Sequence, residues 1–175
     1  VLRKAWEKGI MNCDIPRQYG GKGYGLLENV LITEELAAAC AGLATSIFDN
    51  SLGMEPLRLS TNDALKQKYF PLIAKSFKLI SFATSEPSMG SDVAGIRCLA
   101  RRDGDDYIIN GQKIWTSGAH LADWIHLLAR TDPDAPKHRG ISYFMINLRS
   151  PGITIRPLIQ LTGVHGFNEV FFDDV

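Results

Sequence analysis

The chain has 175 residues, of which 45% are hydrophobic, a proportion that is typical of a polypeptide with a packed core. Its 19 basic and 19 acidic residues cancel, which disfavours a binder of nucleic acid or of anionic membranes. Three widely spaced cysteines, Cys13, Cys40 and Cys98, disfavour a disulfide framework or a zinc site and favour a reducing compartment. The N-terminus shows no signal-peptide pattern, and no uninterrupted apolar run is long enough to span a bilayer.

The pattern of residues 1–78 predicts a helical domain. The chain starts inside a helical pattern without a Met, and residues 15–25 carry one Pro and four Gly, which indicates a loop. From Leu26 apolar residues recur three and four apart, as in an amphipathic helix. A second helix is expected from about Ala44 to Leu59, and Asn62 is among the candidate caps of a third.

Residues 79–175 change to the pattern of a β domain. Short β-rich segments alternate with turn signals, and the strongest of these signals is Asn110-Gly111 between two strand-like runs. We therefore expect an α+β fold, with an N-terminal α-helical domain followed by an antiparallel β-sandwich or barrel. The chain ends on another strand-like run, so we expect it to be a fragment of a longer protein.

Residues 85–92, Ser-Glu-Pro-Ser-Met-Gly-Ser-Asp, follow the first expected strand and hold no His, Cys or Lys. Gly90 would allow a ligand to approach the backbone closely, and the hydroxyls of Ser85, Ser88 and Ser91 can donate and accept hydrogen bonds. The same residue types also form ordinary surface turns, and composition by itself favours that interpretation.

Trp115, followed by Thr116 and Ser117, offers a second pair of interpretations. A Trp at a strand end can stack on a planar ligand whose heteroatoms bond the neighbouring hydroxyls, or it can be a core residue followed by a turn. The four histidines lack the spacing of a metal site, so each is expected to be either hydrogen-bonded or exposed; they are His120, His126, His138 and His165. No Gly-x-Gly-x-x-Gly motif follows a strand, so a dinucleotide-binding Rossmann site is not indicated.

Taken in order, several of these stretches resemble the acyl-CoA dehydrogenases. The resemblance is carried by residues 82–96 (FATSEPSMGSDVAGI), 104–118 (GDDYIINGQKIWTSG) and 122–132 (ADWIHLLARTD). The helical half adds residues 15–23 (IPRQYGGKG), which are similar to a Gly-Gly loop of the family, so the likeness covers almost the whole chain.

The resemblance implies an FAD site in the β domain. Phe82, Thr84 and Ser85 would lie at the flavin ring, while Gly90 and Ser91 would lie towards the phosphates and the thioester end of the substrate. Ser91 would also contact the acyl-CoA. Three further residues complete the implied cofactor set: Trp115, which would pack against the flavin, Thr116, and Ser117, whose hydroxyl would bond flavin N5.

The family reaction implied is α,β-desaturation of an acyl-CoA thioester, with electrons passed to an electron-transfer flavoprotein. The catalytic base is expected in a C-terminal helical domain that this chain lacks, so no catalytic residue is assigned and the chain alone is expected to be inactive. Homotetramers are usual in the family, and the expected location is the bacterial cytoplasm or, in a eukaryote, the mitochondrial matrix. Two departures are Ser88-Met89 in the loop and His165, which stands near the usual basic residue.

Other functions stay open at this point. The intact protein is alternatively an oxidase or flavin monooxygenase relative, a non-catalytic partner subunit of a dehydrogenase heteromer, or a helical-plus-β binding module. The expected partners are an acyl-CoA substrate, an electron-transfer flavoprotein and further copies of the chain. Neither nucleic acid nor a membrane is expected.

Overall fold

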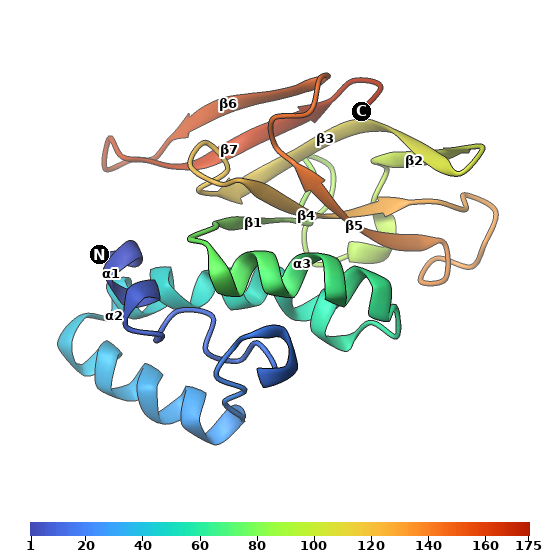
Figure 1. Cartoon of the computed structure of the whole chain (residues 1–175). Coiled ribbons are helices and arrows are strands. Elements are labelled where there is room, and N and C mark those ends of the chain that lie inside the picture. Colours follow the sequence, from blue (N-terminus) through green and yellow to red (C-terminus); the bar gives the residue numbers. More distant parts are fainter. The chain divides into compact units, whose positions relative to one another are not determined.

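The computed structural model describes all 175 residues, which form two compact units, Val1–Lys78 and Leu79–Val175. The first unit is helical and the second contains the β strands (Figure 1). The predicted α+β class, with helices preceding strands, is therefore confirmed.

The helical unit contains α1 (Leu2–Glu7), a 3-10 turn (Arg17–Tyr19), α2 (Leu26–Leu59) and α3 (Asp63–Lys75). Helix α3 begins where the sequence predicts a cap, because the Asn62 side chain accepts a hydrogen bond of 3.1 Å from the amide of Leu65. The largest side chains with 3% exposure or less in this unit are Met11, Ile15, Ile47, Met54, Leu57, Phe70 and Ile73.

Helix α2 is kinked rather than interrupted by a loop. Cys40 has non-helical backbone angles (φ −165°, ψ 107°), which divide the 34 residues into segments 26–39 and 41–59. The two helices that the sequence predicts here are thus joined directly, and the break lies a few residues before the expected start at Ala44. Cys40, like the other two cysteines, is a free thiol.

By length and composition alone, α2 is also apolar enough to cross a membrane, which the search for uninterrupted apolar runs did not reveal. Core helices of soluble proteins and N-terminal signal sequences meet the same criterion, so one such helix does not identify a membrane span. The expectation that the chain has no membrane contact stays a prediction.

The β unit holds seven strands and a 3-10 turn, η2 (Val93–Gly95). The strands are β1 (Ile80–Ala83), β2 (Leu99–Asp103), β3 (Asp106–Ser117), β4 (Trp124–Arg130), β5 (Ile141–Asn147), β6 (Ile153–Ile159) and β7 (His165–Phe172). Their order is β1-β4-β2-β3-β7-β6, and β5 pairs with β4 (Figure 1). The sheet is mixed, which corrects the expected antiparallel arrangement, because β1 and β2 both run parallel to β4.

The pairing of β4 explains where the 84–98 loop lies. Strand β1 pairs with the first half of β4, from Trp124 to Leu127, while Leu99 at the start of β2 pairs with Arg130 at its end. Strand β5 pairs with β4 in antiparallel register along its whole length. Residues 84–98 therefore connect β1 to β2, two strands that pair with different parts of β4.

The turn predicted at Asn110-Gly111 is wrong. Strand β3 runs through both residues, and the hairpin to β2 closes instead at Gly104, next to the Asp103–Asp106 pair. Local turn preference is overruled because β3 pairs with β2 and with β7. Gly111 has a different role, since a Cβ there would lie 2.7 Å from the Cα of Cys98.

Strands from across the β unit contribute to one hydrophobic cluster. Its members are Ala83, Cys98, Ala100, Ile109, Ala119, Ile125, Leu127, Ala129, Leu148, Val170 and Phe172, and none is more than 7% exposed. Small residues sit on β1, β2 and β4, so these strands pack closely where the 84–98 loop begins and ends. This cluster gives the loop a rigid base.

Candidate functional site

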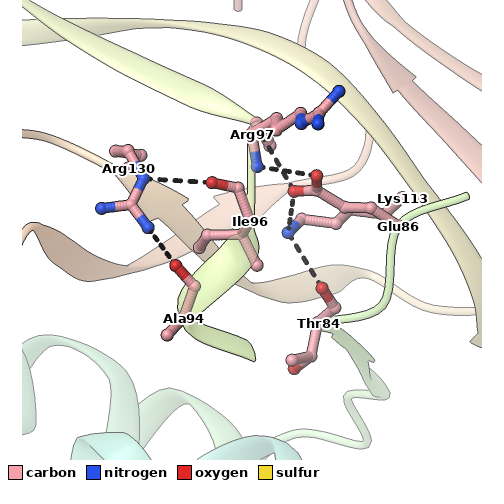
Figure 2. Close-up of polar contacts among 8 residues, drawn as sticks. Thr84, Glu86, Ala94, Ile96, Arg97, Lys113 and Arg130 are labelled. Atoms are coloured by element: carbon pink, nitrogen blue, oxygen red, sulfur yellow. Dashed lines mark hydrogen bonds and ion pairs between the residues drawn. The ribbon is translucent and has the colours of Figure 1, made fainter. Parts of the chain in front are cut away.

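The two limbs of the 84–98 loop are joined by the buried carboxylate of Glu86. Its Oε2 accepts a hydrogen bond of 2.7 Å from the amide of Arg97 (Figure 2). Its Oε1 accepts one of 2.9 Å from the amide of Cys98. Glu86 belongs to the outgoing limb, and both amides belong to the returning one. The side chain of Glu86 thus closes the loop at its base.

Lys113 from β3 neutralises this carboxylate. Its Nζ lies 2.8 Å from Glu86 Oε1 and donates a second hydrogen bond of 3.0 Å to the carbonyl of Thr84 (Figure 2). The two side chains are 0% and 4% exposed, so neither charge is solvated and each depends on the other. The amide of Ile114 also donates to Ser85 O at 3.0 Å, which fixes the outgoing limb against β3.

Arg130 at the end of β4 fixes the returning limb. Its Nη2 donates to the carbonyl of Ala94 at 2.6 Å and its Nε to that of Ile96 at 3.0 Å (Figure 2). The planar guanidinium presents several donors in one plane, which suits two carbonyls spaced two residues apart. We call the parts of the loop held by Glu86, Lys113 and Arg130 its neck.

The tip of the loop, residues 88–91, is open by comparison. A tight turn forms because the amide of Glu86 bonds Met89 O and the amide of Met89 bonds Glu86 O. Gly90 and Ser91 beyond it are exposed, and no heavy atom lies within 4 Å of the position that a Gly90 Cβ would occupy. Backbone and hydroxyl of the tip are therefore accessible to a ligand.

Trp115 stands on a bulge of β3. Its φ of +59° is unusual for a bulky residue, and the register of β3 against β7 shifts between Lys113 and Thr116. The indole is 58% exposed and contacts Phe167 edge-on, with ring centroids 6.1 Å apart. Of the two interpretations of this residue, the core Trp is therefore wrong, and an aromatic surface is available for stacking.

The two residues after Trp115 differ from each other. Thr116 is 0% exposed and its hydroxyl has no hydrogen-bond partner, whereas Ser117 is exposed. The carbonyl of Ser117 accepts a hydrogen bond of 2.9 Å from the hydroxyl of Ser81, so the end of β3 is tied to β1. Only Ser117 presents its hydroxyl to the exterior.

Phe82 on β1 lies beside a buried histidine. Its ring is 36% exposed and meets the ring of His126 edge-on, with centroids 4.5 Å apart. His126 is 1% exposed and neither ring nitrogen has a partner, so the expectation that each His is hydrogen-bonded or exposed is wrong here. Burial, with the charge of Lys113 as a smaller cause, lowers the pKa of His126 to about 4. The ring is neutral at physiological pH.

The structure brings together most of the residues that the sequence singles out. Residues 81–85 and 113–117 are joined by three contacts: Ser81 to Ser117 O, Lys113 to Thr84 O, and Ile114 to Ser85 O. The tip, with Gly90 and Ser91, is joined to them only through the neck. An exposed indole next to the exposed Ser117 fits a planar, hydrogen-bonding ring such as a flavin.

Sequence reasoning missed the residues that hold this arrangement. Lys113 and Arg130 were not singled out, and Glu86 was treated only as a part of the loop motif. One signal was present, because a Lys inside a strand-like run would need a carboxylate partner if it were buried. That signal does not indicate which carboxylate.

Comparison with known proteins decides the family. The model of the acyl-CoA dehydrogenase N-terminal domain matches residues 1–76, and that of the acyl-CoA dehydrogenase middle domain matches residues 81–175. The chain belongs to the acyl-CoA dehydrogenase family. The acyl-CoA dehydrogenase middle domain thus comprises the sheet and the 84–98 loop described above.

Individual relatives agree with this assignment. The chain is 38% identical over 177 residues to acyl-CoA dehydrogenase IpdE1 of Mycobacterium tuberculosis, covering 98% of the chain and 46% of that protein. It matches the glutaryl-coenzyme A dehydrogenase in a glutaryl-CoA complex with a TM-score of 0.88 and 35% identity, over 100% of the chain and 45% of that one. A glutaryl-CoA dehydrogenase of Mycobacterium smegmatis in complex with FADH2 matches at 28% identity with a TM-score of 0.84, over 99% and 44%.

These matches cover almost all of this chain but less than half of each relative. The acyl-CoA dehydrogenase chain described here spans about half the length of the curated relatives it matches, although almost all of its own residues are aligned. Of the two domains present, the middle domain carries both the 84–98 loop and the β3 bulge.

Proposed function

We propose that the protein to which this chain belongs catalyses the FAD-dependent α,β-desaturation of an acyl-CoA thioester and passes the electrons to an electron-transfer flavoprotein. The observation that carries the proposal is the match of two consecutive family domains over residues 1–76 and 81–175. The site supports it, because the neck of the 84–98 loop connects the open tip to β3, the strand that carries the exposed indole of Trp115.

The middle domain would hold the flavin through residues of the 84–98 loop and of β3. The cofactor set comprises Phe82, Thr84, Ser85, Gly90, Ser91, Trp115, Thr116 and Ser117. Because its side chain is 0% exposed, Thr116 would contribute backbone groups rather than its hydroxyl. Bound flavin supplies the acceptor for the β-hydride of the substrate.

Substrate would meet the same loop. Ser91 is exposed at the tip and would contact the acyl-CoA, where its hydroxyl can donate to a carbonyl oxygen. Gly90 leaves its backbone accessible next to it.

Glu86 is not available as the catalytic base. Its carboxylate is buried and already binds Lys113 and the amides of Arg97 and Cys98. Both carboxylate oxygens already have partners, so this group cannot approach a substrate without breaking the neck. The base is therefore expected outside this chain, in the part of the protein that corresponds to the second half of the relatives.

The proposal is tested with the full-length protein by recording its visible absorption spectrum anaerobically, before and after addition of a panel of acyl-CoA thioesters. A bound-flavin spectrum that bleaches with one thioester is the expected result and would also identify the substrate class. Bound flavin that no thioester bleaches would overturn the dehydrogenase reaction and favour other flavin chemistry. A folded oligomer without flavin would overturn the proposal and favour a non-catalytic partner subunit. The tetramer and the cellular location stay predictions.

A further inference from the structure

A second polar cluster lies against the β3 bulge, on the strand that faces it. Asn168 of β7 is 0% exposed and is paired with Thr116 in the register of the sheet. Its Nδ2 donates to Thr116 O at 2.9 Å and lies 3.2 Å from His120 Nδ1, while its Oδ1 lies 2.7 Å from His165 Nε2. The two imidazole rings stack with centroids 3.9 Å apart and an angle of 21° between their planes.

The orientation of the Asn168 amide follows from the carbonyl of Thr116. A carbonyl oxygen only accepts, so the group that faces it must be the NH₂ of the amide. A flipped amide would place Oδ1 against Thr116 O, with two acceptors 2.9 Å apart. Because Asn168 is buried, no water can take the place of the lost partner.

This orientation determines which ring nitrogen of each histidine carries a hydrogen. The Oδ1 of Asn168 can only accept, so Nε2 of His165 carries a hydrogen. The Nδ2 of Asn168 can only donate, so Nδ1 of His120 is unprotonated and its proton is on Nε2. Burial and the neighbouring His165 lower the pKa of His120, which agrees with a neutral ring. All hydrogen-bonding groups of the amide are then in use.

The cluster acts on a strained part of the backbone. Trp115 holds a φ of +59°, and such a conformation persists only where its surroundings impose it. Asn168 bonds the carbonyl of the next residue, and the amide of Gly118 bonds Gly166 O at 3.0 Å. These contacts hold the bulge from the β7 side, whereas the neck of the loop holds the other end of the site.

We propose that Asn168, oriented by His165 and His120, is a positioning residue that sets the 115–117 bulge in the geometry that receives the flavin. The inference rests on the proposed function, since it assigns the bulge to that cofactor. It gives a role to His165, the residue at which the sequence departs from its family. The role is one of orienting an amide and not of contacting an anionic group directly.

The test compares variants of the full-length protein in the apo form, titrated with FAD. Asn168→Asp keeps the shape of the side chain but removes its NH₂, so Thr116 O loses its donor and faces a second oxygen. His165→Phe keeps a ring for stacking but removes the N–H that orients the amide. His138→Phe is the matched control, because His138 is an exposed histidine of the same domain and distant in sequence from the bulge.

The expected result is that Asn168→Asp weakens FAD binding by about tenfold and His165→Phe by about threefold. Both variants should also shift the visible absorption bands of the flavin that they bind, because the ring is then held differently. A substitution that merely lowered overall stability would change the melting temperature and leave these bands in place. His138→Phe should bind FAD with the wild-type affinity and spectrum.

A second readout does not depend on flavin. Hydrogen exchange of the backbone amides of residues 115–118 should be faster in Asn168→Asp than in the wild-type apo protein and unchanged in His138→Phe. If the wild-type protein binds FAD and both test variants match it in affinity, spectrum and exchange, the positioning role is overturned while the proposed function stands. If the wild-type protein does not bind FAD, the proposed function fails, and unchanged exchange would then overturn the positioning role separately.

If Asn168→Asp does not fold, His165→Phe decides the matter. Its side chain is only partly buried, so the substitution is expected to be tolerated. Wild-type affinity, bands and exchange in that variant would overturn the role of His165 in orienting the amide.

Discussion

The neck and the tip of the 84–98 loop are built in opposite ways. The neck contains a fully buried ion pair, Glu86 and Lys113, together with Arg130, which binds two carbonyls. The tip contains exposed small residues, and nothing lies within 4 Å of where a Gly90 side chain would start. The difference shows that charge is used here to position a loop and that the part offered to a ligand is left free of charge pairing.

An exposed ion pair of the same loop allows the free energies of a buried and an exposed pair to be compared. Lys137 lies 3.8 Å from Asp92, and their side chains are 73% and 64% exposed. Such pairs are worth about 0–1 kcal/mol, because water and salt screen them. Removing one partner of a buried pair costs about 3–5 kcal/mol, because the other charge is left without a solvating group.

The largest effect is expected for Lys113→Met. The free energy of unfolding should fall by about 3–5 kcal/mol, since Glu86 is left buried without its counter-charge. Lys137→Met, which breaks the exposed pair, should change it by no more than about 0.5 kcal/mol. Urea unfolding of the full-length protein measures both values, and equal effects of the two substitutions would remove the distinction between neck and surface.

The second effect concerns pH and His126. Its pKa is about 4 in the folded protein against 6.5 in an unfolded chain, so below pH 6.5 the unfolded state binds more protons. Stability from this residue is complete above pH 6.5 and is lost as the pH falls towards 4, by about 2–3 kcal/mol.

His126→Phe isolates that contribution, because the aromatic ring remains between Phe82 and Tyr143. The free energy of unfolding of the variant, measured between pH 7 and 4, should decline less than that of the wild type. His138→Phe should retain the wild-type decline. Parallel pH curves for wild type and His126→Phe would contradict the neutral, buried state of this imidazole.

A smaller effect is expected for Arg130→Gln. The carbonyls of Ala94 and Ile96 lose the guanidinium that binds them, at a cost of about 1–3 kcal/mol. The matched control is Arg149→Gln at an exposed position, with a change of no more than about 0.5 kcal/mol. Thermal unfolding followed by circular dichroism compares the two variants. A change for Arg130→Gln no larger than that for the control would mean that the returning limb does not need this anchor.

The smallest effect on stability, and the sharpest on the ligand, is expected at the tip. Gly90→Ala should change the free energy of unfolding by about 0.5 kcal/mol or less, since its Cβ enters open space. The same methyl group should weaken FAD binding by about tenfold, because it blocks close approach to the backbone. Gly42→Ala, a second glycine with nothing within 4 Å, should leave FAD affinity unchanged. Titration of the full-length apo protein measures both, and unaltered affinity in Gly90→Ala would remove Gly90 from the cofactor set.

Local patterns predicted the elements better than the contacts between them. The cap at Asn62 and the start of a helix at Leu26 depend on neighbours a few residues away, and both appear in the structure. The amphipathic face expected of that helix does not, because Leu26, Leu27, Val30 and Leu31 are exposed. The turn at Asn110-Gly111 failed although its signal is equally local, because β3 continues there, passing from its pairing with β2 at Asn110 to its pairing with β7 at Gly111. A local preference of this size is easily exceeded by several backbone hydrogen bonds and by the close approach of Gly111 to Cys98.

The sequence by itself determined the order of helices and strands and, through ordered motifs, the acyl-CoA dehydrogenase family. Tertiary structure alone decided that Glu86 is paired with Lys113, 27 residues away, and that Asn168 binds Thr116 O, 52 residues away. The physical reason is the distance along the sequence between the residues that interact. Periodicity and capping arise between residues within one or two turns of each other, whereas the partner of a buried charge or amide is chosen by the register and topology of the sheet.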